Sequence, residues 1–139
     1  MIALDTNILA RFYVEDERDP QAAKQRKIAL RIMQRSPSLY VPRTVVLELE
    51  WVMRGLYGFK AGPIAGAFEH LLGLPNVAVE DRDLVQSALG QMRQGLDFAD
   101  ALHLAASHRC SEMITFDARR FAKRSNRLGL KPRCSVPLR

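Results

Sequence analysis

Short, mostly apolar runs alternate with longer amphipathic stretches along this chain. The short runs lie at residues 2–4, 39–41, 77–79 and 113–115, and their continuous apolar character is typical of strands covered on both faces. Helical patterns lie between and after them, at about 8–13, 20–35, 45–57, 64–72, 98–108 and 118–123, with another ending at residue 94. The alternation predicts an α/β fold of three layers, α/β/α, with a small, mostly parallel central sheet. We expect a single domain over residues 1–139.

Local signals place the ends of several helices. Thr6 and Asn7 can cap a helix that begins at Ile8, and Thr44 is a good cap for the helix of 45–57. Gly95 should stop the helix that ends at residue 94. Val136 is a candidate for an edge strand in the basic tail.

Composition bounds the class of protein. The chain has 47% hydrophobic and 26% charged residues, as an ordinary globular domain does. No apolar run is long enough to span a membrane, and the first residues lack a basic segment followed by an apolar one, so we expect no signal peptide. We therefore expect a cytoplasmic location, without membrane attachment, and two reduced cysteines, Cys110 and Cys134.

The formal net charge of +6 is unevenly distributed. Residues 109–139 contain nine Lys or Arg side chains against only Glu112 and Asp117. A basic surface attracts polyanions such as nucleic acid. Solubility or an acidic protein partner would also explain the charge, so composition favours nucleic acid without deciding it.

Acidic residues from separate segments should meet at one edge of the predicted sheet. Parallel strands end at a common edge, and the helices that lead into them begin there, which is where open α/β sheets bind their ligands. Asp5 and Asp117 follow strands, Asp97 and Asp100 open a helix, and Glu48 lies early in the helix after residues 39–41. We therefore expect these carboxylates to lie close together.

Such clustering is unfavourable unless a cation is present. Carboxylate oxygens are suited to a hard divalent ion, Mg²⁺ or Mn²⁺, and no Cys/His cluster points to zinc. A metal held by carboxylates can activate a water and offset charge on a phosphate, which is the chemistry of phosphodiester hydrolysis.

Four motifs carry a family resemblance. They are Leu-Asp-Thr-Asn at 4–7, Val-Leu-Glu-Leu at 46–49 with Trp51, Asp-Phe-Ala-Asp-Ala-Leu-His at 97–103, and Thr-Phe-Asp at 115–117. Their order and spacing resemble those of the PIN domain, and with the total length they are similar to the VapC toxins of bacterial toxin–antitoxin pairs. The resemblance implies a Mg²⁺- or Mn²⁺-dependent endoribonuclease that hydrolyses RNA. It also implies inhibition by a VapB-type antitoxin whose tail enters the active-site groove, contact with operator DNA only through that antitoxin, and a homodimer.

The resemblance also assigns roles to residues. The catalytic and metal-binding acids would be Asp5, Glu48, Asp100 and Asp117, with Asp97 as an accessory acid. Thr6, Asn7 and Thr115 would support these acids, with the two threonine hydroxyls orienting the carboxylates. The cations nearest in sequence to the acidic motifs, Arg11, Arg119 and Arg120, are candidates for phosphate contacts.

Simpler interpretations stand beside these. Asp100 could serve only the helix dipole and Asp117 only a helix cap. We expect His103 to be a packed or hydrogen-bonded core residue and Glu50 to be a solvated surface acid. Tyr13 and Phe12 should pack rather than bind, and Trp51 should lie in the core or at a dimer surface.

Two other functions compete with the ribonuclease. One is a non-catalytic RNA-binding or interaction protein whose acids are structural. The other is a metal-dependent phosphatase of a different α/β fold. The first motif reads Asp-Thr-Asn, without the second aspartate of an aspartyl nucleophile, and this argues against the phosphatase.

Overall fold

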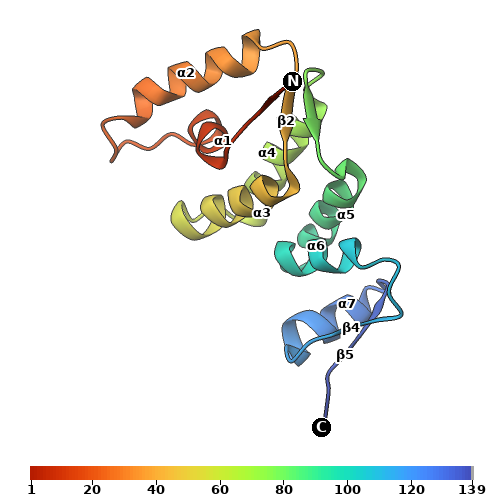
Figure 1. Cartoon of the computed structure of the whole chain (residues 1–139). Helices are drawn as coiled ribbons and strands as arrows, with labels where there is room; N and C mark the ends of the chain where they lie inside the picture. The colour runs from red at the N-terminus through yellow and green to blue at the C-terminus, as the bar shows by residue number, and fades with distance from the viewer. Residues whose placement is uncertain (139) are drawn as a thin grey trace. The chain divides into compact units, whose positions relative to one another are not determined.

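The computed structural model describes residues 1–138. The chain divides into two compact units, Met1–Arg82 and Asp83–Arg139. Figure 1 follows the chain through both of them from the N-terminus to the C-terminus.

A parallel sheet of three strands organises the first unit. The strands are β1 (Ile2–Ala3), β2 (Leu39–Val41) and β3 (Val77–Val79), in the order β1-β2-β3. Leu39 pairs with Ile2 on one side and with Val77 on the other. The central strand β2 is the best covered, because its apolar side chains Leu39 and Val41 are fully buried. All three strands lie where the apolar runs predicted them.

One expectation for the first strand is wrong. We predicted residues 2–4 to be covered on both faces, yet Ile2 is 55% exposed and only Leu4 is buried. The reason is position: β1 is an edge strand of this sheet and β2 is its only partner there. An edge strand leaves part of its side chains and one row of backbone groups uncovered.

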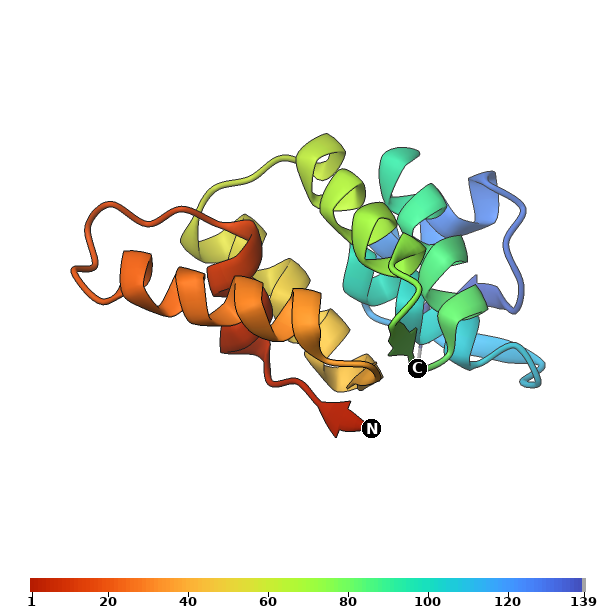
Figure 2. The same cartoon turned by 90° about the horizontal axis from the view of Figure 1, so that it is seen from above.

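Helices surround this sheet in the first unit. They are α1 (Thr6–Tyr13), α2 (Ala22–Arg35), α3 (Arg43–Trp51) with its π-helical extension η1 (Val52–Leu56), and α4 (Ala61–Gly73). α1 packs against both α2 and α3, and α4 packs against β3. Figures 1 and 2 show α2 next to α1 in two perpendicular views.

Two predicted helix caps are wrong. α1 begins at Thr6 and its cap is Asp5, whose carboxylate accepts a hydrogen bond from the Thr6 N–H at 2.7 Å. α3 begins at Arg43 rather than after Thr44. Its first N–H group is satisfied by Glu80, which accepts from the Arg43 N–H at 2.8 Å. The cap therefore comes from another element, which local sequence cannot reveal.

The second unit contains a separate small sheet. β4 (Glu112–Ile114) and β5 (Arg133–Ser135) run parallel, with Met113 opposite Cys134. Its helical segments are α5 (Arg82–Arg93), which begins at the last residue of the first unit, α6 (Phe98–Ala106), the π-helical turn η2 (Ala118–Ala122) and α7 (Lys123–Arg127). β5 ends one residue before Val136, the predicted edge-strand position.

The predicted fold class is confirmed. The element order and the small parallel sheet of three strands are consistent with a three-layer α/β/α fold. Cys110 and Cys134 are both free thiols. Within the described residues, no helix combines the length and the apolar character that a membrane span needs.

Candidate active site

The turn after β1 holds the first candidate acid. Asp5 directly follows Leu4, and its backbone leaves the strand in an extended conformation to cap α1. The cap fixes one carboxylate oxygen against the Thr6 N–H, while the side chain stays at the exposed end of the strand. The α1 N-terminus also favours negative charge at this position. Asp5 is therefore both structural and available to a ligand.

Glu48 is joined to the same turn by a side-chain hydrogen bond. Thr6 is 5% exposed, and its hydroxyl donates to Glu48 Oε1 in a short hydrogen bond. Glu48 belongs to α3, 42 residues away in sequence. The buried threonine thus orients the glutamate through this hydrogen bond. Contacts of this kind hold metal-binding side chains in place.

A groove of about 720 Å³ opens beside these residues. Its polar lining includes Asp5, Asn7, Arg11, Glu48 and Tyr57. Ile28, Val52 and Leu56 supply apolar walls. Two acids, one arginine and apolar surface therefore share a single concave region within the first unit.

Arg11 lines this groove but is already engaged by acids. Its Nε donates to Gln25 Oε1 at 2.8 Å, its guanidinium forms a short ion pair with Asp19, and Asp16 lies 3.8 Å away. The pKa of Asp19 is lowered, first by the backbone hydrogen bond from Gln21 and then by Arg11. Much of the arginine's charge is thus balanced inside the protein, which weakens it as a phosphate contact.

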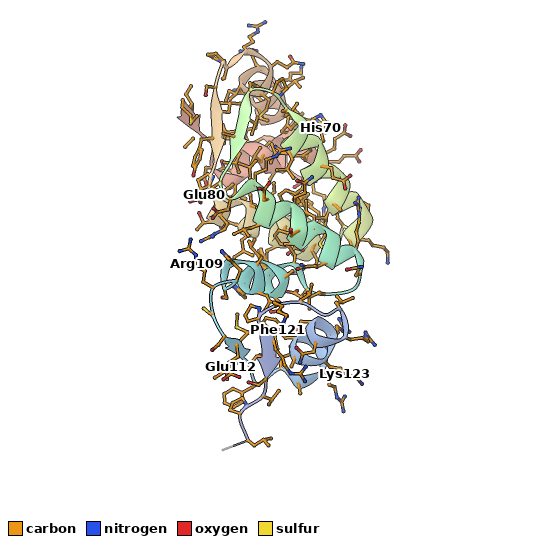
Figure 3. All side chains as sticks on the ribbon, turned by 90° about the vertical axis from the view of Figure 1, so that its right-hand side faces the viewer. His70, Glu80, Arg109, Glu112, Phe121 and Lys123 are labelled. Carbon is orange, nitrogen blue, oxygen red and sulfur yellow. The ribbon has the colours of Figure 1, made fainter. Side chains whose placement is uncertain are left out.

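Sequence reasoning overlooked one acid at the edge of this sheet. Glu80 follows β3 directly, as Asp5 follows β1 closely, and Figure 3 labels it. Besides capping α3 it stands next to Asp81, whose carboxylate accepts from Arg43 at 2.7 Å. Burial raises the pKa of Tyr40, and Glu80 and Asp81 raise it further. The pattern of an apolar strand followed by acids was the available signal.

In the second unit, Asp97 and Asp100 share the start of α6. Asp97 is the cap and accepts a hydrogen bond from the Asp100 N–H at 3.1 Å. Asp100 is half-buried. Its pKa is raised first by burial and then by the negative charges of Asp97 and Asp117, while His103 opposes the shift. Asp100 is therefore a carboxylate whose charge is poorly accommodated by the protein alone.

Asp117 caps the turn that follows β4. Its carboxylate accepts from the Arg120 N–H at 2.8 Å, and its own N–H donates to Thr115 Oγ1 at 3.0 Å. The predicted capping role is confirmed. The negative charge of Asp117 also raises the pKa of Asp100, so Asp117 does more than cap the turn.

The expectations for His103 and Glu50 are wrong. His103 is exposed rather than packed in the core. Glu50 is only 2% exposed and pairs with Arg54 at 2.9 Å. It lies four residues after Val46 and three before Met53, both fully buried, so it belongs to the buried stripe of the helix. Tyr13, in contrast, packs as predicted: its ring centroid lies 4.7 Å from that of Phe12 and 5.6 Å from that of His70.

Each unit thus brings together part of the predicted set. The first joins Asp5, Thr6 and Glu48, and the second couples Asp97, Asp100 and Asp117. Between Met1 and Leu138, no group of three or more Asp, Glu, His or Cys side chains has the arrangement of a metal site. The donors available are carboxylate oxygens, and this donor chemistry fits a hard divalent cation.

Comparison with known proteins identifies the family. The PIN domain matches residues 2–126, a range that contains every candidate acid from Asp5 to Asp117. No curated protein matches the chain. PIN domains are generally nucleases and typically use divalent metal ions. Since the match covers most of its length, the chain belongs to the PIN domain family.

Proposed function

We propose that this protein is a metal-dependent endoribonuclease and the toxin of a VapBC-type toxin–antitoxin pair. The observation that carries the nuclease proposal is the environment of Asp100. Its carboxylate is half-buried, and its pKa is raised by burial first and then by the negative charges of Asp97 and Asp117. A bound cation would relieve this repulsion, and membership of a nuclease-type family supplies the reaction class.

The proposed ligands are the family acids, Asp5, Glu48, Asp100 and Asp117. When bound, Mg²⁺ or Mn²⁺ would supply positive charge that makes a water more acidic and offsets charge on the scissile phosphate. The remaining roles belong to the chain itself. Thr6 holds Glu48 in place, Thr115 fixes the backbone of Asp117, and Asp97 anchors the first turn beneath Asp100. Asn7 lies in the groove beside Asp5.

Cleavage of RNA tests the nuclease proposal directly. Purified protein, shown to be folded and free of antitoxin, is incubated with a mixed pool of structured RNAs in Mg²⁺, in Mn²⁺ and in EDTA. We expect cutting with either metal and none in EDTA. Cutting that persists in EDTA would contradict metal dependence. Release of inorganic phosphate from small phosphate esters would favour the phosphatase instead.

Thr6 offers a test of how the site is positioned. Thr6→Ala removes the hydroxyl that donates to Glu48, so we expect kcat/KM for RNA to fall by about tenfold or more, as for other residues that orient ligands. Thr6→Ser keeps the hydroxyl and should retain most of the activity. A titration of activity against Mg²⁺ should show a higher half-saturating concentration for Thr6→Ala than for Thr6→Ser. Equal behaviour of the two variants would remove this role.

The toxin role rests on the resemblance of motif order and total length. It predicts a VapB-type antitoxin encoded beside this chain, whose tail occupies the groove that contains Asp5 and Glu48. Adding that antitoxin should suppress RNA cleavage, and operator DNA should bind the pair but not this chain alone. An antitoxin that binds without suppressing cleavage would contradict the proposal.

A homodimer belongs to the same proposal. Trp51 is 55% exposed and Leu56 is 61% exposed on neighbouring turns of the first unit, and such apolar surface favours a protein contact. Sedimentation equilibrium should give twice the chain mass of 15.7 kDa. A single species at the chain mass would overturn the dimer and leave the nuclease proposal intact.

A non-catalytic RNA-binding protein is the second candidate, favoured by the basic second unit. It predicts salt-sensitive binding with no metal requirement. Binding without cleavage, by protein that is folded and loaded with metal, would support it over the nuclease.

A further inference from the structure

One face of the segment formed by η2 and α7 carries a row of cations. The residues on this face are Arg119, Arg120, Lys123, Arg124 and Arg127, called the basic track below. All five are exposed. The opposite face is buried through Phe121, Ala122 and Ser125. Figure 3 shows Lys123 on the outer side of this helix, so the segment is amphipathic with a purely positive outer face.

The cations of the track are not neutralised by neighbouring acids. Residues 118–127 contain no Asp or Glu. Within the described part of the chain, Arg119, Lys123 and Arg127 form no ion pair with a carboxylate. Arg26 on α2, in contrast, pairs with Glu15 at 3.0 Å. Unpaired cations in a row raise the local positive potential and attract a polyanion.

The track starts at a candidate catalytic acid. The Asp117 carboxylate accepts from the Arg120 N–H at 2.8 Å, so the acid sits on the first turn of the segment. The five π-helical and five α-helical residues extend at most about 15 Å. This length corresponds to roughly four phosphates at the axial spacing within one stacked nucleic-acid strand. A single row of this length matches one backbone rather than the two backbones of a duplex.

An aromatic side chain stands at the same end. Phe116 immediately precedes Asp117 and is 86% exposed. An exposed aromatic ring beside a positive groove or row is the combination that single-strand-binding proteins use, because every base can stack on the ring. Ordinary packing does not explain this side chain, since it contributes almost no buried area.

We propose that Phe116 and the basic track form the binding surface for a single-stranded segment of RNA next to Asp117. Phe116 stacks on one base, and the cations follow the phosphates that lead away from the acid. This proposal rests on the nuclease function for its choice of RNA, but its binding test does not require cleavage.

The test measures binding in EDTA, where no metal-dependent cleavage interferes. A labelled single-stranded RNA of mixed sequence is titrated with protein at several salt concentrations, and fluorescence anisotropy gives Kd. The triple variant Arg119→Gln, Lys123→Gln, Arg127→Gln should reduce the slope of log Kd against log salt by about 2, from a contribution of about 0.7 per phosphate contact. Glutamine keeps helix propensity, so the fold should persist.

A matched control comes from α2. Lys24, Lys27 and Arg31 are also exposed cations on one helix, and changing all three to glutamine removes the same charge. We expect the control variant to keep at least about two-thirds of the wild-type slope of log Kd against log salt. Cations that do not touch the RNA attract it only over long range, and salt screens that attraction. Equal loss in the two triple variants would overturn the track, since binding would then follow net charge only.

Phe116 is tested separately. Phe116→Leu keeps an apolar side chain but removes the ring, and should raise Kd by about fivefold or more with an unchanged salt slope. Phe116→Trp should bind as well as wild type. If Phe116→Leu binds normally, stacking is overturned. If the track variant loses salt slope as expected but no RNA is cut with metal, the nuclease proposal fails and the binding surface stands. If RNA is cut with metal but the track variant keeps the wild-type salt slope, the binding surface fails and the nuclease proposal stands.

Discussion

Asp100→Asn is expected to lower the rate of RNA cleavage by at least about 100-fold, which is roughly 3 kcal/mol in the activation barrier. Asparagine has nearly the same shape but lacks the negative charge that attracts a divalent cation, so it is a weaker ligand. Single-turnover cleavage in saturating Mg²⁺, with protein in excess of RNA, measures this loss without interference from product release. Asp5→Asn should behave in the same way.

Asp83→Asn is the matched control for this experiment. Asp83 is an exposed acid in the first turn of α5, just as Asp100 lies in the first turn of α6. Both variants therefore lose a negative charge that interacts favourably with the helix dipole. Only Asp100→Asn should lose cleavage. Full activity in Asp100→Asn would refute its place in the site, and equal loss in both variants would reduce Asp100 to a structural acid.

The same variant should be at least as stable as wild type when metal is absent. The pKa of Asp100 is raised in the folded protein, so folding favours the protonated form and stability falls as pH rises through the interval above the ordinary pKa. At pH 7 the ionised carboxylate is therefore unfavourable, and asparagine removes this cost. Since the group is partly exposed and screened, we expect a gain of no more than about 1 kcal/mol. Thermal unfolding in EDTA at pH 7 measures it, and a large loss would contradict the electrostatic account.

The strands and most helices were predictable because their signals are local. Each of the four apolar runs became a strand within one residue of its predicted position. Strand pairing was less accessible: β4 pairs with β5, and the two form a sheet of their own. Asp5 and Glu80 therefore share one sheet edge, since both follow strands of the first sheet, whereas Asp117 follows a strand of the second.

The candidate site was predictable to a similar depth. Position after a strand or at a helix start identified the acids, and Thr6 was expected to orient a carboxylate because a motif contains it. The engagement of Arg11 by Asp19 could not be predicted, since it joins helix α1 to the loop before α2, and the sequence does not show the path of that loop. Glu50 shows a second limit. Its offset from Glu48 correctly indicated a different face, but sequence did not reveal that this face is buried against apolar neighbours.

Burial of Glu50 makes its partner important for stability. The glutamate side chain is 2% exposed, whereas Arg54, one helical turn later, is 48% exposed. Arg54→Met retains the aliphatic part of the side chain but leaves a carboxylate buried without the guanidinium. We expect the free energy of unfolding to fall by about 2–3 kcal/mol, below the full range for a completely buried pair because the arginine is half exposed. Urea unfolding followed by the fluorescence of Trp51, the single tryptophan, reports on this unit.

A second variant separates charge from packing. In the double variant Glu50→Gln, Arg54→Met, no charge remains to be desolvated, so at least about half of the lost stability should return. Arg31→Met on α2 serves as the control for replacing an exposed helical arginine, and should change stability by less than about 0.5 kcal/mol. If the double variant is no more stable than Arg54→Met, the loss comes from the arginine's other contacts rather than from a stranded charge. Recovery in the double variant would instead mean that the helix carrying Glu48 into the groove depends on an ion pair on its opposite, buried side.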